Sequence, residues 1–94
     1  MHTDSSKQIV LKKLQVIPGV GKSIAADLYH IGILDVKDLI GKSPEELYRQ
    51  SNTYAGVVQD ICLLYVFRCA VYFATEKKHD PEKLQWWYWK DHKY

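Results

Sequence analysis

A glycine-rich turn sets the architecture of this chain: Ile17-Pro18-Gly19-Val20-Gly21-Lys22-Ser23-Ile24-Ala25-Ala26-Asp27-Leu28. Pro18 lacks a donor N–H and glycine accepts positive φ, so a helix that arrives at this turn cannot continue through it. A second helix begins near Lys22, because apolar residues recur at helical spacing from Ile24 to Ile31. The turn therefore predicts two helices joined by a tight hairpin.

The same turn has the features of an anion site. Two glycines one residue apart, directly before a helix, expose backbone N–H groups at the positive end of the helix dipole. Without Cβ atoms at Gly19 and Gly21 a phosphate can approach the backbone, and Lys22 adds a cation beside it. We expect Val20 to point inward and brace the turn.

A nucleotide-binding P-loop is the competing interpretation. Gly21-Lys22-Ser23 and Gly41-Lys42-Ser43 both resemble the end of that motif. The full pattern requires a glycine five residues before the second one, and Val16 and Val36 stand at those positions. Neither segment comes after a buried strand, so neither is a P-loop.

Helix start and stop signals divide the rest of the chain into short segments. Caps and first-turn prolines mark starts at Ser5 with Gln8, at Asp35, at Ser43-Pro44-Glu45-Glu46 and at Asp80-Pro81. The expected helices cover residues 6–15, 22–30, 36–40, 44–51 and 59–76, with a loop at 52–58 and a short sixth helix from residue 81. Gly32, in the left-handed conformation, and Gly41 close the second and third helices. No alternation of period two appears, so we expect an all-α domain of five to six short helices.

The expected core draws on several of these helices. Its predicted members include Ile9, Val10, Leu14, Leu47 and Tyr48. Arg68 interrupts the apolar run at 61–74, and its side chain is expected to reach the surface or to pair with Asp60 or Glu76.

The length and composition exclude several protein classes. Ninety-four residues with a formal net charge of +2 and 47% hydrophobic residues describe one globular domain that is not strongly basic. The run at 61–74 is shorter than the roughly 20 residues that span a bilayer. Residues 1–6 contain no apolar run after a basic cluster, so we expect no secretory signal and no membrane partner.

The two cysteines, Cys62 and Cys69, lie seven residues apart on one predicted helix, roughly 10 Å along its axis. They are too far apart to bridge each other. We expect buried free thiols and a cytoplasmic location, and no zinc site, because no histidine stands at ligand spacing.

Aromatic residues are unusually frequent, at 13%, and four of them form the run Trp86-Trp87-Tyr88-Trp89. Exposed rings stack on nucleobases, with about 1–3 kcal/mol per base. A small helical domain has a thin core, however, and a tail that folds back as a lid buries more apolar area. We therefore expect Trp86 and Trp87 to form a lid and leave Trp89 open. Lys90, His92 and Lys93 would suit a phosphate-binding rim.

Residues 14–40 resemble the helix-hairpin-helix motif of DNA repair and recombination proteins. The resemblance rests on Ile17-Pro18-Gly19-Val20-Gly21, followed by Ala25, Leu28, Gly32 and Leu39. The run from Leu64 to Ala74 and the segment from Asp80 to Trp87 further resemble small bacterial proteins of the pathogenicity-locus, or mitomycin-resistance-like, helix-hairpin-helix family. The second resemblance covers nearly the whole chain and implies a SAM-like helical domain, with DNA binding as the presumed role.

The resemblance implies specific contacts. Hairpin amides hold the DNA backbone without reading bases, which would fall here to the segment Gly19, Val20, Gly21, Lys22, Ser23 and Ile24. Some members place a monovalent cation, K⁺ or Na⁺, among hairpin carbonyls, which would be those of Gln15, Ile17 and Val20. No other cofactor is expected. The implied partner is duplex DNA, bound without sequence specificity.

The chain departs from the pattern where a second hairpin is expected. The segment Tyr54-Ala55-Gly56-Val57-Val58-Gln59 places Val58 at the second glycine position, where a β-branched side chain resists positive φ and blocks a phosphate. One hairpin predicts weak affinity, with a dissociation constant of about 10⁻⁴ to 10⁻⁶ M. A homodimer or a partner protein would be needed for tight binding.

We therefore expect a single domain over residues 1–94, with a helix-hairpin-helix motif at 6–31, a degenerate helical pair at 43–76 and an aromatic tail at 80–94 packed on it. The chain is not expected to be an enzyme, because the catalytic helix-hairpin-helix glycosylases have a much larger fold. The alternative function is a SAM-like protein interaction module without DNA binding.

Overall fold

The computed structural model describes residues 2–94, and the all-α prediction is confirmed. Within that range the chain forms four α-helices: α1 (His2–Leu14), α2 (Lys22–His30), α3 (Pro44–Ala55) and α4 (Cys62–Thr75). Three short 3₁₀ helices complete it: η1 (Val36–Leu39), η2 (Pro81–Leu84) and η3 (Trp86–Lys90).

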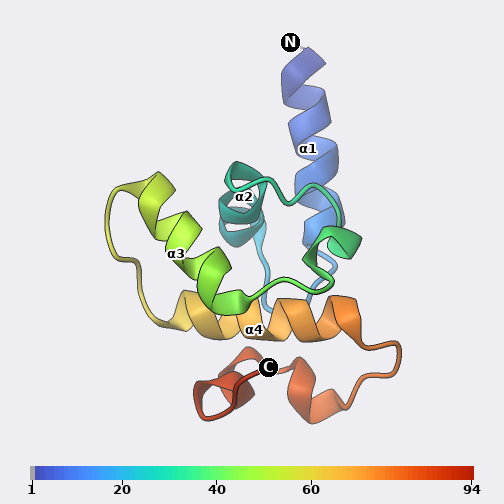
Figure 1. The fold of residues 1–94 in the computed structure, drawn as a ribbon. Coiled ribbons are helices and arrows are strands. Elements are labelled where there is room, and N and C mark those ends of the chain that lie inside the picture. The colour runs from blue at the N-terminus through green and yellow to red at the C-terminus, as the bar shows by residue number, and fades with distance from the viewer. Residues whose placement is uncertain (1) are drawn as a thin grey trace.

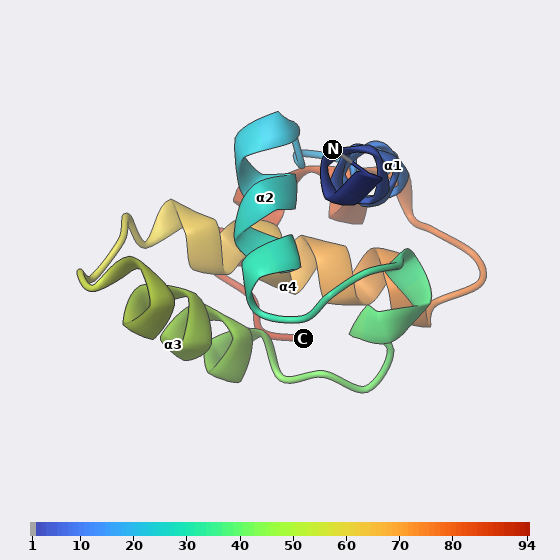
Figure 2. The same cartoon turned by 90° about the horizontal axis from the view of Figure 1, so that it is seen from above.

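Helix α4 lies at the centre of the fold. In Figure 1 it runs across the molecule, with α1, α2, α3 and η1 on one side and the C-terminal tail of η2 and η3 on the other. Seen from above in Figure 2, α1 and α2 lie side by side and α3 lies on the other side of α2. Because elements cover α4 from both sides, it is apolar around most of its circumference, and even its arginine is buried.

The apolar interior has two parts that meet at α4. The larger core lies among the four α-helices, and its fully buried members include Leu14, Ile17, Leu28, Leu39 and Phe67. The smaller core lies between α4 and the tail, around Cys69, Tyr72 and Trp89. The aromatic tail thus packs on the domain, as predicted.

Short-range hydrogen bonds fix where the helices begin. The carboxylate of Asp35 accepts from the Val36 N–H at 2.7 Å, and Asp38 closes a capping box at η1. The Ser43 hydroxyl accepts from the Glu46 N–H at 3.2 Å, and Pro44 occupies the first turn of α3. These start signals are confirmed.

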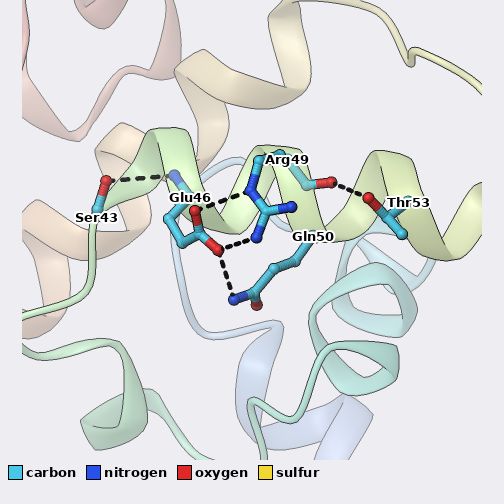
Figure 3. A network of polar contacts seen from close by, with 5 residues as sticks. All are labelled: Ser43, Glu46, Arg49, Gln50 and Thr53. Atoms are coloured by element: carbon cyan, nitrogen blue, oxygen red, sulfur yellow. Dashed lines mark hydrogen bonds and ion pairs between the residues drawn. The ribbon is translucent and has the colours of Figure 1, made fainter.

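Side chains on the exposed face of α3 form a continuous polar network (Figure 3). The Glu46 carboxylate pairs with Arg49 and accepts from the Gln50 amide at 3.0 Å. Hydrogen bonds from Arg49 and Gln50 hold the pKa of Glu46 at about 2. One turn further on, the Thr53 hydroxyl donates to the Arg49 carbonyl at 3.0 Å. These i, i+3 and i, i+4 contacts support the helix from outside the core.

The start of the first helix was predicted too late. The backbone is helical from His2, so Ser5 lies inside α1 rather than at its cap; the Ser5 side chain lies outside the described side chains. Neither proline nor glycine precedes Ser5, so nothing stops the helix there. The buried face also differs, because Ile9 is exposed and Leu11 takes the inward position three residues before Leu14.

Other boundaries differ for local reasons. Helix α3 continues to Ala55, so the loop expected from residue 52 begins only at Gly56, whose φ of +76° ends the helix. Helix α4 begins at Cys62 instead of residue 59. The expected helices at 36–40 and after Pro81 are 3₁₀ helices. Tyr48 is half-buried and its hydroxyl donates to the Gln59 carbonyl at 2.5 Å.

Among residues 2–94, no helix has both the length and the apolar composition needed to cross a membrane.

Candidate nucleic-acid interface

The hairpin between α1 and α2 is closed by two backbone hydrogen bonds. The Val20 N–H donates to the Ile17 carbonyl at 3.0 Å, and the Ala25 N–H donates to the Gly21 carbonyl at 2.9 Å. Gly19 has a φ of +82°, and Val20 is buried in the main core, so its predicted inward orientation is confirmed. Beyond α2, Gly32 has the predicted left-handed conformation, with a φ of +93°.

The amides directly after the hairpin have no acceptor among the described residues. No described residue accepts a hydrogen bond from the backbone N–H of Gly21, Lys22, Ser23 or Ile24, and no side chain caps α2. Three of these N–H groups belong to the first turn of a nine-residue helix, where the dipole is positive. Lys22 is exposed and forms no ion pair with a described residue. The predicted anion-binding residues therefore lie together at one exposed helix end.

Gly21 is not required by the backbone. Its φ of −91° and ψ of −170° are open to any residue, and a Cβ built there would meet no atom within 4 Å. Neither strain nor crowding within the chain accounts for a glycine at this position. The open space in front of it would admit a ligand to the backbone.

Gly19 has a different reason to be glycine, which sequence reasoning missed. Besides its positive φ, a Cβ at this position would lie 3.2 Å from Cδ1 of Trp86. The start of η3 thus packs directly on the hairpin, although the two residues are far apart in the sequence. No sequence signal connects them.

The three tryptophans of the tail have different environments. Trp89 is only 3% exposed, Trp86 is half-buried against the main core, and Trp87 is 55% exposed. The lid prediction is therefore correct for Trp86 and wrong for Trp87, and Trp89 joins the lid. The reason is the 3₁₀ geometry of η3, in which residues three apart share a face.

The indole of Trp89 contacts both η2 and α4. Its indole Nε1–H donates to the Lys83 carbonyl at 2.9 Å, and its ring lies 5.4 Å from that of Tyr72. Both contacts tie η3 to neighbouring elements.

Arg68 fastens the tail to the helical domain. It is 7% exposed, and its Nη1 donates to the carbonyls of Trp89 at 2.8 Å and His92 at 3.3 Å. Its Nε donates to the Glu45 carboxylate at 3.2 Å, so the predicted partners Asp60 and Glu76 were wrong. Glu45 lies in the first turn of α3, which only the tertiary fold brings to α4.

A cavity of about 400 Å³ lies beside the hairpin, between α2 and the start of α4. Gly19 and Trp86 line one end of it, and Asp27 and Asp60 supply its acidic groups. Burial raises the pKa of Asp27 above its usual range, an effect that nearby His30 opposes. Cys62 also lines this cavity and is exposed, so its predicted burial was wrong.

The thiols differ in environment. Cys69 is buried as predicted, and burial raises its pKa to about 11. The Asp60 carboxylate, through a side-chain hydrogen bond, raises the pKa of Cys62. Both cysteines are free.

A family model for pathogenicity locus proteins, Cdd1, matches residues 7–94. This chain belongs to the Cdd1 pathogenicity locus family. The match includes both the hairpin and the tail that packs on it, so the Cdd1 domain includes the contact between Gly19 and Trp86. No curated protein and no solved structure matches the chain.

The second turn of the Cdd1 chain, between α3 and α4, differs from the hairpin. Val57 and Val58 are 63% and 84% exposed and do not brace the turn. The Gln59 N–H donates to the Asn52 side chain at 2.9 Å, and the Cys62 N–H donates to the Asp60 carboxylate at 2.8 Å. Two amides of this turn are therefore satisfied by the chain itself, that of Gln59 by an amide oxygen and that of Cys62 by a negative charge.

The described residues of this Cdd1 protein bring together no group of three His, Cys, Asp or Glu side chains that could hold a metal ion. The cation suggested by resemblance would depend on backbone oxygens. The carbonyls of Gln15 and Val20 accept no backbone hydrogen bond from a described residue, whereas that of Ile17 accepts one from Val20. A carbonyl oxygen has two lone pairs, so all three could still contact a cation.

Proposed function

We propose that this Cdd1 family protein binds DNA without sequence specificity, by holding a backbone phosphate on the hairpin amides. The observation that carries the proposal is the row of amides from Gly21 to Ile24, which lack an acceptor among the described residues and lie beside Lys22. Gly19 and Val20 set the turn that presents them.

The arrangement of N–H donors suits a phosphate group better than an anion with fewer acceptor oxygens. Several N–H groups converge at a positive helix end, and a tetrahedral phosphate offers several acceptor oxygens at once. Contacts of this kind position a duplex and carry no sequence information. The low net charge of +2 is consistent with a grip by neutral amides and one lysine.

The proposal includes no catalytic step, since the amides and Lys22 hold the phosphate without making or breaking a bond. A monovalent cation held by the carbonyls of Gln15, Ile17 and Val20 would add positive charge at the same phosphate. We place this activity in DNA repair or recombination in the cytoplasm, where two free thiols are stable.

The experiment is a titration of fluorescently labelled duplex DNA, followed by anisotropy across a salt series. Gly21→Val combined with Lys22→Glu should abolish binding, because the valine side chain fills the approach to the amides and the glutamate repels phosphate. Valine is compatible with the φ of Gly21 and meets no atom at its Cβ, so the variant should fold.

The chain contains a matched control for this variant. Gly41-Lys42-Ser43 repeats the tripeptide before another helix, but Pro44 has no N–H and the Ser43 hydroxyl caps α3. Lys42→Glu removes the same charge as Lys22→Glu and should retain most of the binding. Wild-type protein that fails to bind DNA at low salt would contradict the proposal. Equal losses of affinity from Lys22→Glu alone and from Lys42→Glu would contradict it as well.

One observation favours a second candidate function, a protein interaction module. Large apolar side chains are exposed around the turn between α3 and α4, at Tyr54, Val57, Val58 and Ile61. Such a patch is typical of surfaces that bind another protein or a second copy. Sedimentation of the wild type and of Val57→Ser with Val58→Ser tests it: an oligomer that the variant dissociates supports a homodimer, and a monomer in both excludes one.

A further inference from the structure

The tail contains a second feature suited to phosphate, a hollow of about 560 Å³ between the end of α4, the segment before η2 and the last residues of the chain. The rings of Tyr72, Trp89 and Tyr94 form its aromatic walls. Three lysines stand around it, Lys78, Lys83 and Lys93.

The lysines of this hollow are not neutralised by its acidic groups. Among the described residues, none of the three lysines forms an ion pair. The two carboxylates in the lining have other partners: Glu76 accepts from the Tyr94 hydroxyl at 2.6 Å, and Asp80 accepts from the Glu82 N–H at the start of η2. Three ammonium groups against two engaged carboxylates leave an excess of positive charge.

Two histidine rings of the hollow are held in fixed positions. His79 donates from Nε2 to the Phe73 carbonyl at 2.8 Å and stacks on the Phe73 ring. The Nδ1 of His92 lies 2.8 Å from the Tyr88 carbonyl, and its ring stacks on that of Tyr88 at 4.0 Å. Because a carbonyl only accepts, each ring uses one N–H in this contact and turns its other nitrogen elsewhere. The walls are therefore preorganised.

The tail connects this hollow to the hairpin. Trp86 contacts Gly19, and Trp89, three residues later in the same 3₁₀ helix, lines the hollow. At about 2.0 Å per residue the two rings are roughly 6 Å apart along η3. Phosphates of one strand advance about 3.4 Å per nucleotide along a duplex, so this step along η3 corresponds to about two nucleotides.

From these observations we propose that the lysines around the tail hollow bind the phosphate backbone of the same DNA that the hairpin holds. This inference rests on the proposed function. The α3–α4 turn is less suited to a second grip, because Val58 stands at the second glycine position and the Asp60 carboxylate already accepts from the Cys62 N–H. The second grip comes from the tail. The aromatic tail thus serves both as a lid for the core and as the second contact with the ligand.

The salt dependence of DNA affinity tests the inference. Each lysine that neutralises a phosphate adds about 0.9 to the slope of log affinity against log salt concentration. Replacing Lys78, Lys83 and Lys93 by glutamine should lower that slope by about 2 to 3 and weaken binding at low salt at least tenfold. The backbone carbonyl of Lys83 remains, so its hydrogen bond with Trp89 is kept.

A control triple with Lys12, Lys37 and Lys42 replaced by glutamine removes the same charge from exposed positions elsewhere. We expect its slope to change by less than 1. Equal slopes for the two triple variants would overturn the inference, because overall charge alone would then account for the loss. If the tail triple unfolds, Lys78→Gln with Lys93→Gln keeps the half-buried Lys83 and should lower the slope by about 2.

The outcomes separate this inference from the proposed function. Binding that the hairpin variant abolishes but the tail triple leaves unchanged overturns the tail contact alone. Wild-type protein that binds no duplex overturns both. A slope that falls in the tail triple and not in the control supports a contact of the tail with DNA.

Discussion

The two turns between α-helices, at Pro18–Gly21 and at Gly56–Ile61, begin alike and end differently. Each contains a glycine with positive φ, at Gly19 and Gly56. After the first, Val20 is buried and the amides from Gly21 to Ile24 lack acceptors among described residues. After the second, Val58 is exposed, and the Gln59 and Cys62 amides are bound by Asn52 and Asp60. The turns therefore differ in the residues that come after the glycine, and not in the glycine itself.

This comparison separates the folding role of such a turn from its binding role. Positive φ is enough to reverse the chain direction, and both turns achieve it. An anion site additionally requires a small residue in front of the amides and no internal cap. The first turn meets both conditions, whereas the second has Val58 at the position of Gly21 and the Asp60 carboxylate on the Cys62 N–H.

The largest expected effect comes from removing Arg68, which supports the first turn by holding the tail against it. Arg68→Ala leaves the carbonyls of Trp89 and His92 without their buried donor and should lower the free energy of unfolding by about 3 kcal/mol. Because Arg68 holds the tail and the tail packs on Gly19, exchange of the hydrogen-bonded Val20 amide should accelerate more than that of the Gln59 amide in the α3–α4 turn. Urea unfolding and hydrogen exchange measure both quantities.

Arg49→Ala is the control for that variant, since it removes an exposed arginine from the α3 network of Figure 3. Only a small shift of its urea midpoint is expected, because exposed ion pairs of this kind contribute little to stability. A similar loss in both variants would mean that Arg68 has no special structural role.

A smaller effect distinguishes the glycines themselves. Gly19→Ala and Gly56→Ala both place an alanine at positive φ, with a cost of about 1 to 2 kcal/mol each. Only Gly19 also faces Trp86, at 3.2 Å, whereas Gly56 faces open space. We expect about 2 kcal/mol for Gly19→Ala and about 1 kcal/mol for Gly56→Ala in thermal unfolding. Equal losses of stability would show that Trp86 moves away from an alanine at position 19 without an energetic cost.

The smallest effects are those of two carboxylates on the pH dependence of stability. They have opposite signs for Asp27, in α2 after the hairpin, and for Asp60, in the α3–α4 turn. Burial raises the pKa of Asp27 above its usual 3.8, so its contribution to stability is present below 3.8 and is lost as the pH rises through the folded pKa. The Cys62 backbone N–H lowers the pKa of Asp60, so that contribution is present above 3.8 and is lost as the pH falls through the folded pKa.

At pH 7, therefore, Asp27→Asn should raise the thermal midpoint and Asp60→Asn should lower it. Both differences from the wild type should shrink when the pH falls well below 3.8, as melting curves followed by circular dichroism would show. Shifts of the thermal midpoint with the same sign in the two variants at pH 7 would contradict the opposite pKa shifts of Asp27 and Asp60.

Local sequence signals predicted the parts of this fold that depend on neighbouring residues. The caps at Asp35 and Ser43 and the left-handed Gly32 each depend on residues a few positions away, and all are confirmed. The hairpin was recognisable for the same reason, because its glycines, Val20 and the start of α2 are contiguous. Its anion-binding role stays a prediction.

Long-range contacts were not predictable from one sequence. The pairing of Arg68 with Glu45 and the packing of Trp86 on Gly19 join segments that only the tertiary fold brings together. The error at Trp87 had a nearer cause, since a 3₁₀ helix distributes four consecutive aromatic residues differently from an α-helix.

The contact between Gly19 and Trp86 also affects when the hairpin can reach its final structure during synthesis. The two residues are 67 positions apart, so the hairpin leaves the ribosome well before the tail residue that forms its outer wall. A peptide cut from residues 6–31 would lack that wall. The motif in this protein is therefore not a portable module, and transplanting it to another scaffold would require a substitute for the tail.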